Sequence, residues 1–264
     1  MQHVISLYDY TGEALKPWAK KGYTCHAFDI QHDEASLVDR FEGGGSISFH
    51  KADLHDHKNL NAIYYAFADK PVAFGMAFPV CTDLAVSGAA WFKKKAEANP
   101  SFQDEAVSHA VWCAEVFRSL KIPYFIENPV SVLATKWRKP DYSFHPYEYG
   151  GYIPYGEEQH PRWPDFIAPR DAYPKKTCLW TGGGFKMPVK AEVSCESFGF
   201  SRQHSMLGGK SMKTKNIRSA TPRGFAIAVF EANSSPCIGV CTLVEDVCVG
   251  CDRTIEEITN KAVA

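Results

Sequence analysis

Short apolar runs alternate with stretches of helical periodicity through the first half of the chain, which is typical of βαβ units around a parallel sheet. Strands are expected at residues 4–8, 23–30, 46–49, 72–78 and 124–126, and helices at 15–19, 60–67 and 106–120. The chain is therefore predicted to be an α/β protein of the Rossmann-like kind, with a mononucleotide-binding half at its start.

Polar residues that could take part in binding or catalysis lie at the carboxyl ends of these predicted strands. Asp29 closes the second strand, Asp53 follows the third, Cys81 follows the fourth and Glu127 follows the fifth. A tight turn that ends in Gly12 follows the first strand. Because ligands of open α/β sheets bind beyond the carboxyl ends of the strands, all of these residues are expected to face one cleft.

The second half of the chain is less regular. Residues 142–185 are rich in aromatic residues, proline and glycine, and they are expected to form an ordered insertion that either contacts an extruded base or packs on itself as a cap. Pro129 is expected to end the fifth strand. Thr221 and Pro222 predict the start of a last helix, with the Thr221 hydroxyl as its cap.

Composition and charge limit the cell compartment and the partners that can be expected. The 264 residues can bury one substantial core, and nine irregularly spaced cysteines favour reduced thiols over a secreted disulfide scaffold. With no long apolar run and no secretory leader, the protein is expected in the cytoplasm of a bacterium or phage-infected cell, without a membrane partner. The net charge is −1, but residues 198–229 contain no acidic residue. That span is either a phosphate-facing strip or an ordinary solvated basic surface.

A thiol and a carboxyl group at one cleft suit the methylation of a pyrimidine. Carbon 5 of the ring becomes nucleophilic when a thiolate adds to carbon 6 while an acid protonates ring nitrogen 3. Cys81 and Glu127 are the candidates for these roles, and Asn128 is a candidate to orient Glu127. Taken singly, each also fits a purely structural role, since a lone cysteine is commonly a small core residue and Glu-Asn-Pro is commonly only a turn.

Four ordered segments carry a family resemblance. They are VISLYDYTG at 4–12, FDI at 28–30, FPVCTDLAVSG at 78–88 and IENP at 126–129. Together they resemble the motifs of DNA cytosine-5 methyltransferases, especially the short phage and prophage members. Residues 136–141, 145–150 and 176–180 are similar to the phage group too, so the resemblance covers roughly residues 4–232.

The resemblance implies a S-adenosylmethionine-dependent methyltransferase domain over residues 1–233, acting on duplex or single-stranded DNA. It implies Cys81 as the nucleophile and Glu127, with Asn128, as its acid partner. The donor site would be lined by Tyr8, Thr11, Gly12, Asp29, Ile30, Asp53, Leu54 and Pro79. Nucleic-acid contacts are expected from Ser87 and Arg138, and from Lys210, Lys213, Lys215 and Arg218 of the basic span that lacks acidic residues. Neither the resemblance nor the sequence indicates an oligomeric state.

The chain also departs from the family pattern. Val80 precedes the cysteine where typical members have proline, and Pro129 replaces a valine. The family's Gln-x-Arg-x-Arg element has no clear counterpart, with Arg218 only a candidate, and residues 142–185 are much shorter than a typical target-recognition domain. These departures leave two alternatives open: an inactive nucleic-acid-binding or regulatory protein on the same fold, and a hypermodification enzyme with a carboxylated donor. An exocyclic-amine methyltransferase ranks lower, because it would give Cys81 no role.

The tail, residues 234–264, carries a separate signal. Four cysteines, Cys237, Cys241, Cys248 and Cys251, lie within fifteen residues with a Cys-x-x-Cys close. This spacing predicts a metal-binding knuckle, for zinc in the first place and for an iron-sulfur cluster in the second. The segment also resembles a small family of uncharacterised bacterial modules.

Overall fold

A mixed sheet of eight strands forms the centre of the computed structural model, which describes residues 2–34, 37–195, 201–209, 211–234, 242–248 and 254–255. The strands follow the order β3-β4-β2-β1-β5-β6-β8-β7. Their bounds are β1 His3–Leu7, β2 Thr24–Asp29, β3 Val38–Arg40, β4 Ser46–Lys51, β5 Val72–Ala77, β6 Tyr124–Pro129, β7 Tyr142–Phe144 and β8 Thr177–Gly182. The central strands β4, β2, β1, β5 and β6 are parallel. This mostly parallel sheet is consistent with the predicted α/β fold of the Rossmann-like kind.

The order of the strands reverses beside β1. From β1 the chain moves outward through β2 and β4, and it then returns to the other side of β1 with β5 and β6. A crevice forms at such a switch point, beyond the carboxyl ends of the strands. The predicted strands and helices of the first half are therefore confirmed, and they place the chemically interesting strand ends at one edge.

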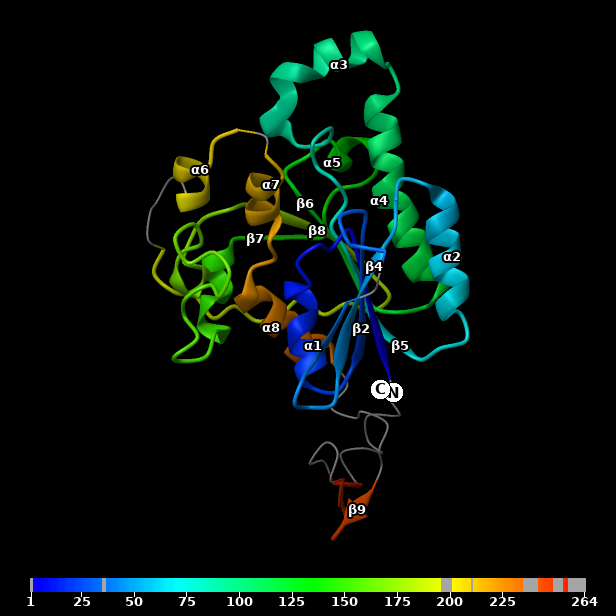
Figure 1. Ribbon diagram of the computed structural model, residues 1–264, viewed down its shortest axis with the longest axis vertical. Coiled ribbons are helices and arrows are strands. Elements are labelled where there is room, and N and C mark those ends of the chain that lie inside the picture. Colours follow the sequence, from blue (N-terminus) through cyan, green and yellow to red (C-terminus); the bar gives the residue numbers. More distant parts are fainter. Residues whose placement is uncertain are drawn as a thin grey trace.

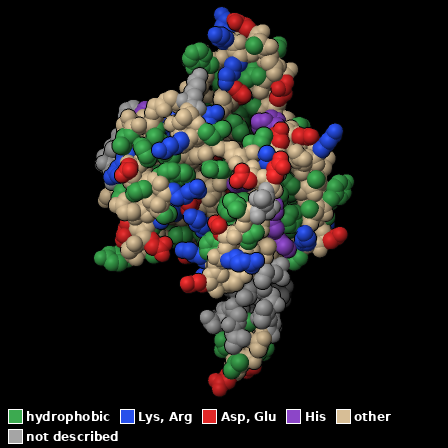
Figure 2. Space-filling model, viewed as in Figure 1, with side chains coloured by type: hydrophobic (Ala, Val, Ile, Leu, Met, Phe, Trp, Pro, Cys, Tyr) green, Lys and Arg blue, Asp and Glu red, His purple; other side chains and the backbone are tan. Residues whose placement is uncertain are grey.

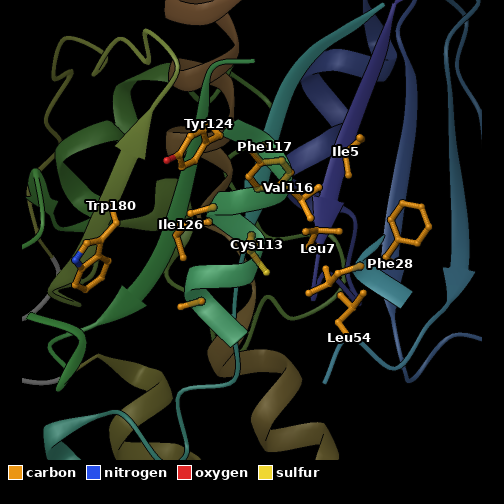
Figure 3. Close-up of a cluster of buried hydrophobic side chains, with 14 of the residues drawn as sticks. Ile5, Leu7, Phe28, Leu54, Cys113, Val116, Phe117, Tyr124, Ile126 and Trp180 are labelled. Carbon is orange, nitrogen blue, oxygen red and sulfur yellow. The ribbon is translucent and has the colours of Figure 1, made fainter. Parts of the chain in front are cut away.

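Helices cover both faces of the sheet (Figure 1). The face that carries α2 (His57–Phe67), α4 (Phe102–Ser119) and α5 (Leu133–Lys136) buries one core, in which Phe28, Phe117 and Trp180 take part. Figure 3 shows how the side chains of α4 meet those of β1, β6 and β8 there. The opposite face is covered by η1 (Glu13–Leu15), α1 (Lys16–Lys20), η3 (Pro146–Tyr152) and α8 (Arg223–Asn233).

A third, smaller cluster of buried apolar side chains lies outside these two cores. It is formed by residues of η4 (Pro169–Asp171) and its surroundings, of the segment after α6 (Arg202–Met206), and of α7 (Met212–Ser219). Its members are Ile167, Ala168, Ala172, Tyr173, Leu207, Ile217 and Ala220. We call this part of the molecule the small lobe. In Figure 1, α6 and α7 lie together on the side of the sheet away from α2 and α4.

The range that the sequence predicts to be an insertion contributes two strands to the sheet. The range 142–185 contains β7 and β8, and β8 runs antiparallel to β6 in the sheet. Its side chains from Thr177 to Trp180 are buried, so this stretch belongs to the core and is not an insertion. Strand β6 ends at Pro129, as the sequence predicts, and Pro129 itself pairs with Thr177.

The last helix begins where the sequence predicts, but its cap is different. The Thr221 hydroxyl makes no capping hydrogen bond to α8. Instead, the buried carboxylate of Asp171 accepts a hydrogen bond from the Gly224 backbone N–H at 2.9 Å. A carboxylate at this position also interacts favourably with the helix dipole, so a distant residue of the small lobe fixes the start of α8.

Further elements complete the description. The 3-10 helix η2 (Val86–Trp91) and α3 (Phe92–Ala98) follow Cys81, and α3 projects away from the sheet (Figure 1). In the tail, β9 (Leu243–Val244) and β10 (Val247–Cys248) form an antiparallel hairpin whose turn residues Glu245 and Asp246 have positive φ. Within the described part of the chain, no helix has the length and apolar character that crossing a membrane requires.

Candidate active site

A cavity of about 730 Å³ lies at the carboxyl ends of β1, β2, β5 and β6. Most of the residues that the sequence nominated for a cleft line this one cavity. They are Tyr8, Asp29, Ile30, Asp53, Leu54, Pro79, Cys81, Ser87, Glu127, Asn128, Lys215 and Arg218. A volume of this size accommodates a ligand as large as a nucleoside derivative with further space beside it.

Cys81 and Glu127 line the same cavity, and Glu127 lies close enough to affect the ionisation of Cys81. Both side chains are partly buried, and burial raises the pKa of the Cys81 thiol, which the Glu127 carboxylate raises further. Burial likewise raises the pKa of Glu127. Among the described residues, no donor makes a hydrogen bond to the Glu127 carboxyl group. The site therefore holds a thiol beside a carboxyl group, and the pKa of each is raised above its ordinary value.

The turn that presents Cys81 is built by backbone hydrogen bonds. The Cys81 carbonyl accepts from the N–H groups of Leu84 and Ala85, at 3.0 and 2.8 Å. The segment is then joined to the loop after β6, because the Val86 N–H donates to the Val130 carbonyl at 3.0 Å. The loops that follow the two reactive residues are thus held to each other.

Asn128 has a different contact from the one expected. It does not bond to Glu127; its Nδ2 donates to the Pro79 carbonyl at 2.9 Å, and the side chain is buried. Pro79 lies two residues before Cys81. Asn128 therefore holds the segment that leads from β5 to Cys81.

Lys175 is a site residue that the sequence interpretation missed. It lines the cavity from the loop before β8, and its charge lowers the pKa of both Cys81 and Glu127, against the effect of burial. Its Nζ donates to the Arg218 carbonyl at 2.9 Å. Only the recognition of β8 as a sheet strand next to β6 would have placed Lys175 beside Glu127.

The other end of the cavity combines carboxylates with apolar walls. We call it the donor subsite, after the methyl donor that the sequence predicts. The buried carboxylate of Asp29 accepts from the Gln31 N–H at 2.8 Å through one oxygen. Tyr8, which has a positive φ, donates its hydroxyl to the Leu54 carbonyl at 2.8 Å, and Ile30 exposes an apolar side chain on the cavity wall. Carboxylates beside apolar walls suit a ligand that combines hydroxyl or amine groups with an apolar ring, as a nucleoside does.

The turn after β1 is shaped from within. The buried Asp9 carboxylate accepts from the backbone N–H groups of Gly12 at 2.8 Å and Thr11 at 3.1 Å, and from the Ser6 hydroxyl at 2.8 Å. Burial raises the pKa of Asp9. Thr11 and Gly12 are not among the residues that line the cavity. Their contact with the methyl donor stays a prediction. Gly12 has a φ of 66°, which a glycine adopts without strain.

The residues nominated for nucleic acid separate into groups. Ser87, Lys215 and Arg218 line the cavity, whereas Lys213 is exposed on α7 away from its wall. Arg138 is paired with Asp141 at 2.8 Å and also donates to the Thr181 carbonyl. Lys210 lies outside the described residues.

The tail knuckle stays a prediction. Cys237, Cys241 and Cys251 lie outside the described residues, and Cys248 is buried on β10. In the ranges that the structure describes, no three His, Cys, Asp or Glu side chains are grouped to hold a metal ion.

Comparisons with known proteins give limited likenesses. A family model described as "Protein of unknown function (DUF1289)" matches residues 235–260, and no curated protein matches the chain. Among solved structures, the chain is similar to a candidate DNA modification methyltransferase encoded within an E. coli prophage. The TM-score is 0.41 at 13% identity, covering 69% of this chain and 46% of that one. The chain thus spans about half the length of that protein.

A second likeness is to a short chain dehydrogenase family protein from Francisella tularensis. Here the TM-score is 0.24 at 12% identity, covering 46% of this chain and 66% of that one. Both TM-scores lie below 0.5, so the function proposed below rests on the side chains of this protein's own cavity.

Proposed function

We propose that the protein transfers a methyl group from S-adenosylmethionine to carbon 5 of cytosine in DNA, through a covalent adduct at Cys81. The observation that carries this proposal is the position of Cys81 and Glu127 on the wall of one cavity whose other end suits the donor. The family resemblance of the surrounding motifs supports it.

The chemistry assigns one task to each side chain. The Cys81 thiol gives its proton to water, its sulfur forms a bond to carbon 6, and the Glu127 carboxyl group gives its proton to ring nitrogen 3, which places the displaced electron pair at carbon 5. A bound S-adenosylmethionine would supply the methyl group to that carbon and leave as S-adenosylhomocysteine. Loss of the carbon 5 proton to water then breaks the bond between carbon 6 and the sulfur, and the proton on ring nitrogen 3 returns to Glu127.

The protonation state of Glu127 agrees with this task. An acid that donates to ring nitrogen 3 must carry a proton at neutral pH, and burial raises the pKa of Glu127 in that direction. Lys175 works against the shift and keeps the carboxyl group able to release the proton. The cavity therefore contains both a candidate proton donor, Glu127, and a positive charge that adjusts its pKa, Lys175.

The test is trapping with an oligonucleotide that contains 5-fluorocytosine, in the presence of S-adenosylmethionine. We expect a stable adduct at Cys81 in the wild type, and none in Cys81→Ser. Cys195→Ser is the matched control, because Cys195 does not line the cavity and its loss should leave trapping unchanged. Mass spectrometry of the modified nucleoside identifies the base and the transferred group, including a group larger than methyl.

An inactive nucleic-acid-binding protein is the second candidate. The observation that favours it is the raised pKa of Cys81, because a thiol that keeps its proton is a weak nucleophile. If the wild type binds the oligonucleotide and the donor yet forms no adduct, this second candidate replaces the enzyme.

A further inference from the structure

Helix α7 is tied to the sheet across the cavity by one side-chain contact. The Nδ2 of Asn216 on α7 donates to the Oε1 of Gln31 at 3.0 Å, between residues 185 positions apart in the sequence. Both residues line the cavity, and Asn216 is buried. The contact joins the small lobe to the end of β2.

The Gln31 end of this contact belongs to the donor subsite. Gln31 follows Asp29 and Ile30, which both line the cavity, and its backbone N–H donates to the Asp29 carboxylate at 2.8 Å. The position of the Gln31 side chain therefore depends on the same carboxylate that is expected to hold the donor's ribose.

The Asn216 end belongs to the small lobe. The next residue, Ile217, packs with Leu207 and Tyr173 in the cluster that is separate from the two main cores. The Arg218 Nη2 donates to the Leu207 carbonyl at 2.8 Å. The small lobe is joined to α8 by the hydrogen bond between Asp171 and Gly224, and the hydrogen bond from Asn216 to Gln31 joins α7 directly to the end of β2.

Helix α7 also carries positive charge into the cavity. Lys215 and Arg218 line it from α7, opposite the carboxyl groups of Asp29, Asp53 and Glu127 on the sheet side. Figure 2 shows Lys and Arg side chains over the region of α7 and acidic side chains beside them. The phosphates of a nucleic acid suit the α7 wall, and the position of α7 sets where they bind.

We infer that Gln31 and Asn216 are positioning residues that link the donor subsite to the nucleic-acid-binding helix, so that the donor and the nucleic acid bind with positive coupling. This inference rests on the proposed function. A donor that orders Asp29 and Gln31 favours the position of α7 in which Asn216 is bonded, and that position presents Lys215 and Arg218 to the phosphates. By linkage, the nucleic acid strengthens donor binding by the same factor.

The coupling is measured from the dissociation constant of a fluorescent oligonucleotide, in single-stranded and duplex form, with and without saturating S-adenosylhomocysteine. For a link through one neutral hydrogen bond, we expect the wild type to bind about two- to tenfold more tightly with the cofactor product. Gln31→Asn shortens the side chain by one methylene and should bring this ratio close to one.

A reciprocal exchange provides the rescue. Gln31→Asn combined with Asn216→Gln restores the total length of the two amides, and we expect it to recover coupling that each single variant loses. A purely structural role for either residue predicts no such recovery. Asn61→Gln is the matched control, because Asn61 lies on α2 and does not line the cavity, so its ratio should equal that of the wild type.

The inference is overturned if the wild type shows no coupling, if Gln31→Asn keeps the wild-type ratio, or if the folded double variant fails to recover it. Trapping at Cys81 is measured separately. Coupling without any Cys81 adduct refutes the proposed chemistry and leaves the link between the two subsites intact, whereas an adduct without coupling refutes the link alone. An oligonucleotide that does not bind under any condition refutes both.

Discussion

The hydrogen bond from Asn128 to the Pro79 carbonyl should control both the stability of the sheet edge and the reactivity of Cys81. In Asn128→Ala, the carbonyl loses a buried donor at 2.9 Å and has no replacement from that side chain. A buried polar group left without its partner costs about 1–3 kcal/mol. We expect the free energy of unfolding to fall by that amount in urea titrations followed by circular dichroism.

The same change should slow adduct formation more than it weakens binding. Cys81 lies two residues beyond Pro79, and a reacting atom displaced by about 1 Å can cost on the order of 100-fold in rate. We therefore expect Asn128→Ala to reduce the rate of 5-fluorocytosine trapping by about 10- to 100-fold at saturating oligonucleotide. The apparent affinity for the oligonucleotide should change little, because Asn128 carries no charge to contact phosphate.

Asn233→Ala is the control for this experiment. Asn233, at the end of α8, also donates an amide hydrogen bond to a backbone carbonyl, that of Lys186 at 2.8 Å, but it does not line the cavity. It should lose stability without losing trapping rate. If Asn128→Ala is destabilised as expected but traps at the wild-type rate, the positioning role assigned to Asn128 is wrong.

Three further predictions concern charge, pH and packing. Glu127→Gln removes a carboxylate that raises the pKa of Cys81, so the pH midpoint of Cys81 alkylation by iodoacetamide should fall. An unchanged midpoint would show that Glu127 does not affect the ionisation of Cys81. Burial lowers the pKa of His26 from 6.5 to about 3, so the unfolded chain binds the extra proton between these values. Unfolding free energy should therefore drop by about 2 kcal/mol from pH 8 to pH 5, and His26→Phe should reduce this slope in urea titrations. Gly75→Ala places a methyl group into the buried ring of Phe117 and should cost about 1–3 kcal/mol by the same measurement, with a wild-type midpoint as the contrary result.

The sequence located the parallel part of the fold because each central strand is a short apolar run followed by a polar residue. The strand ends at Asp29, Cys81 and Glu127 could be placed at one edge for that reason alone, and the structure brings them to one cavity. Their catalytic and binding roles remain predictions. Parallel strands give a strong signal because they are buried on both faces.

The antiparallel part was missed because its signal is weaker. Strand β8 lies between clusters of Pro, Lys and Gly, and its Thr-Cys-Leu-Trp core is too short to stand out from the aromatic residues around it. Missing β8 also hid Lys175, which reaches Glu127 only because β8 pairs with β6. The Asp171 cap on α8 and the Asn216 contact with Gln31 join residues far apart in the sequence, which no local pattern indicates.

The environment of Cys81 distinguishes between two uses of a cysteine. A hydrolase nucleophile is activated in the resting enzyme by a neighbouring imidazole. His55 and His204 also line the cavity, but among the described residues the groups that shift the pKa of Cys81 are Glu127 and Lys175, and no imidazole is one of them. Burial and Glu127 raise the pKa of the Cys81 thiol, and Lys175 lowers it. Under the proposed chemistry, this thiol is expected to attack when a pyrimidine ring is held against Glu127.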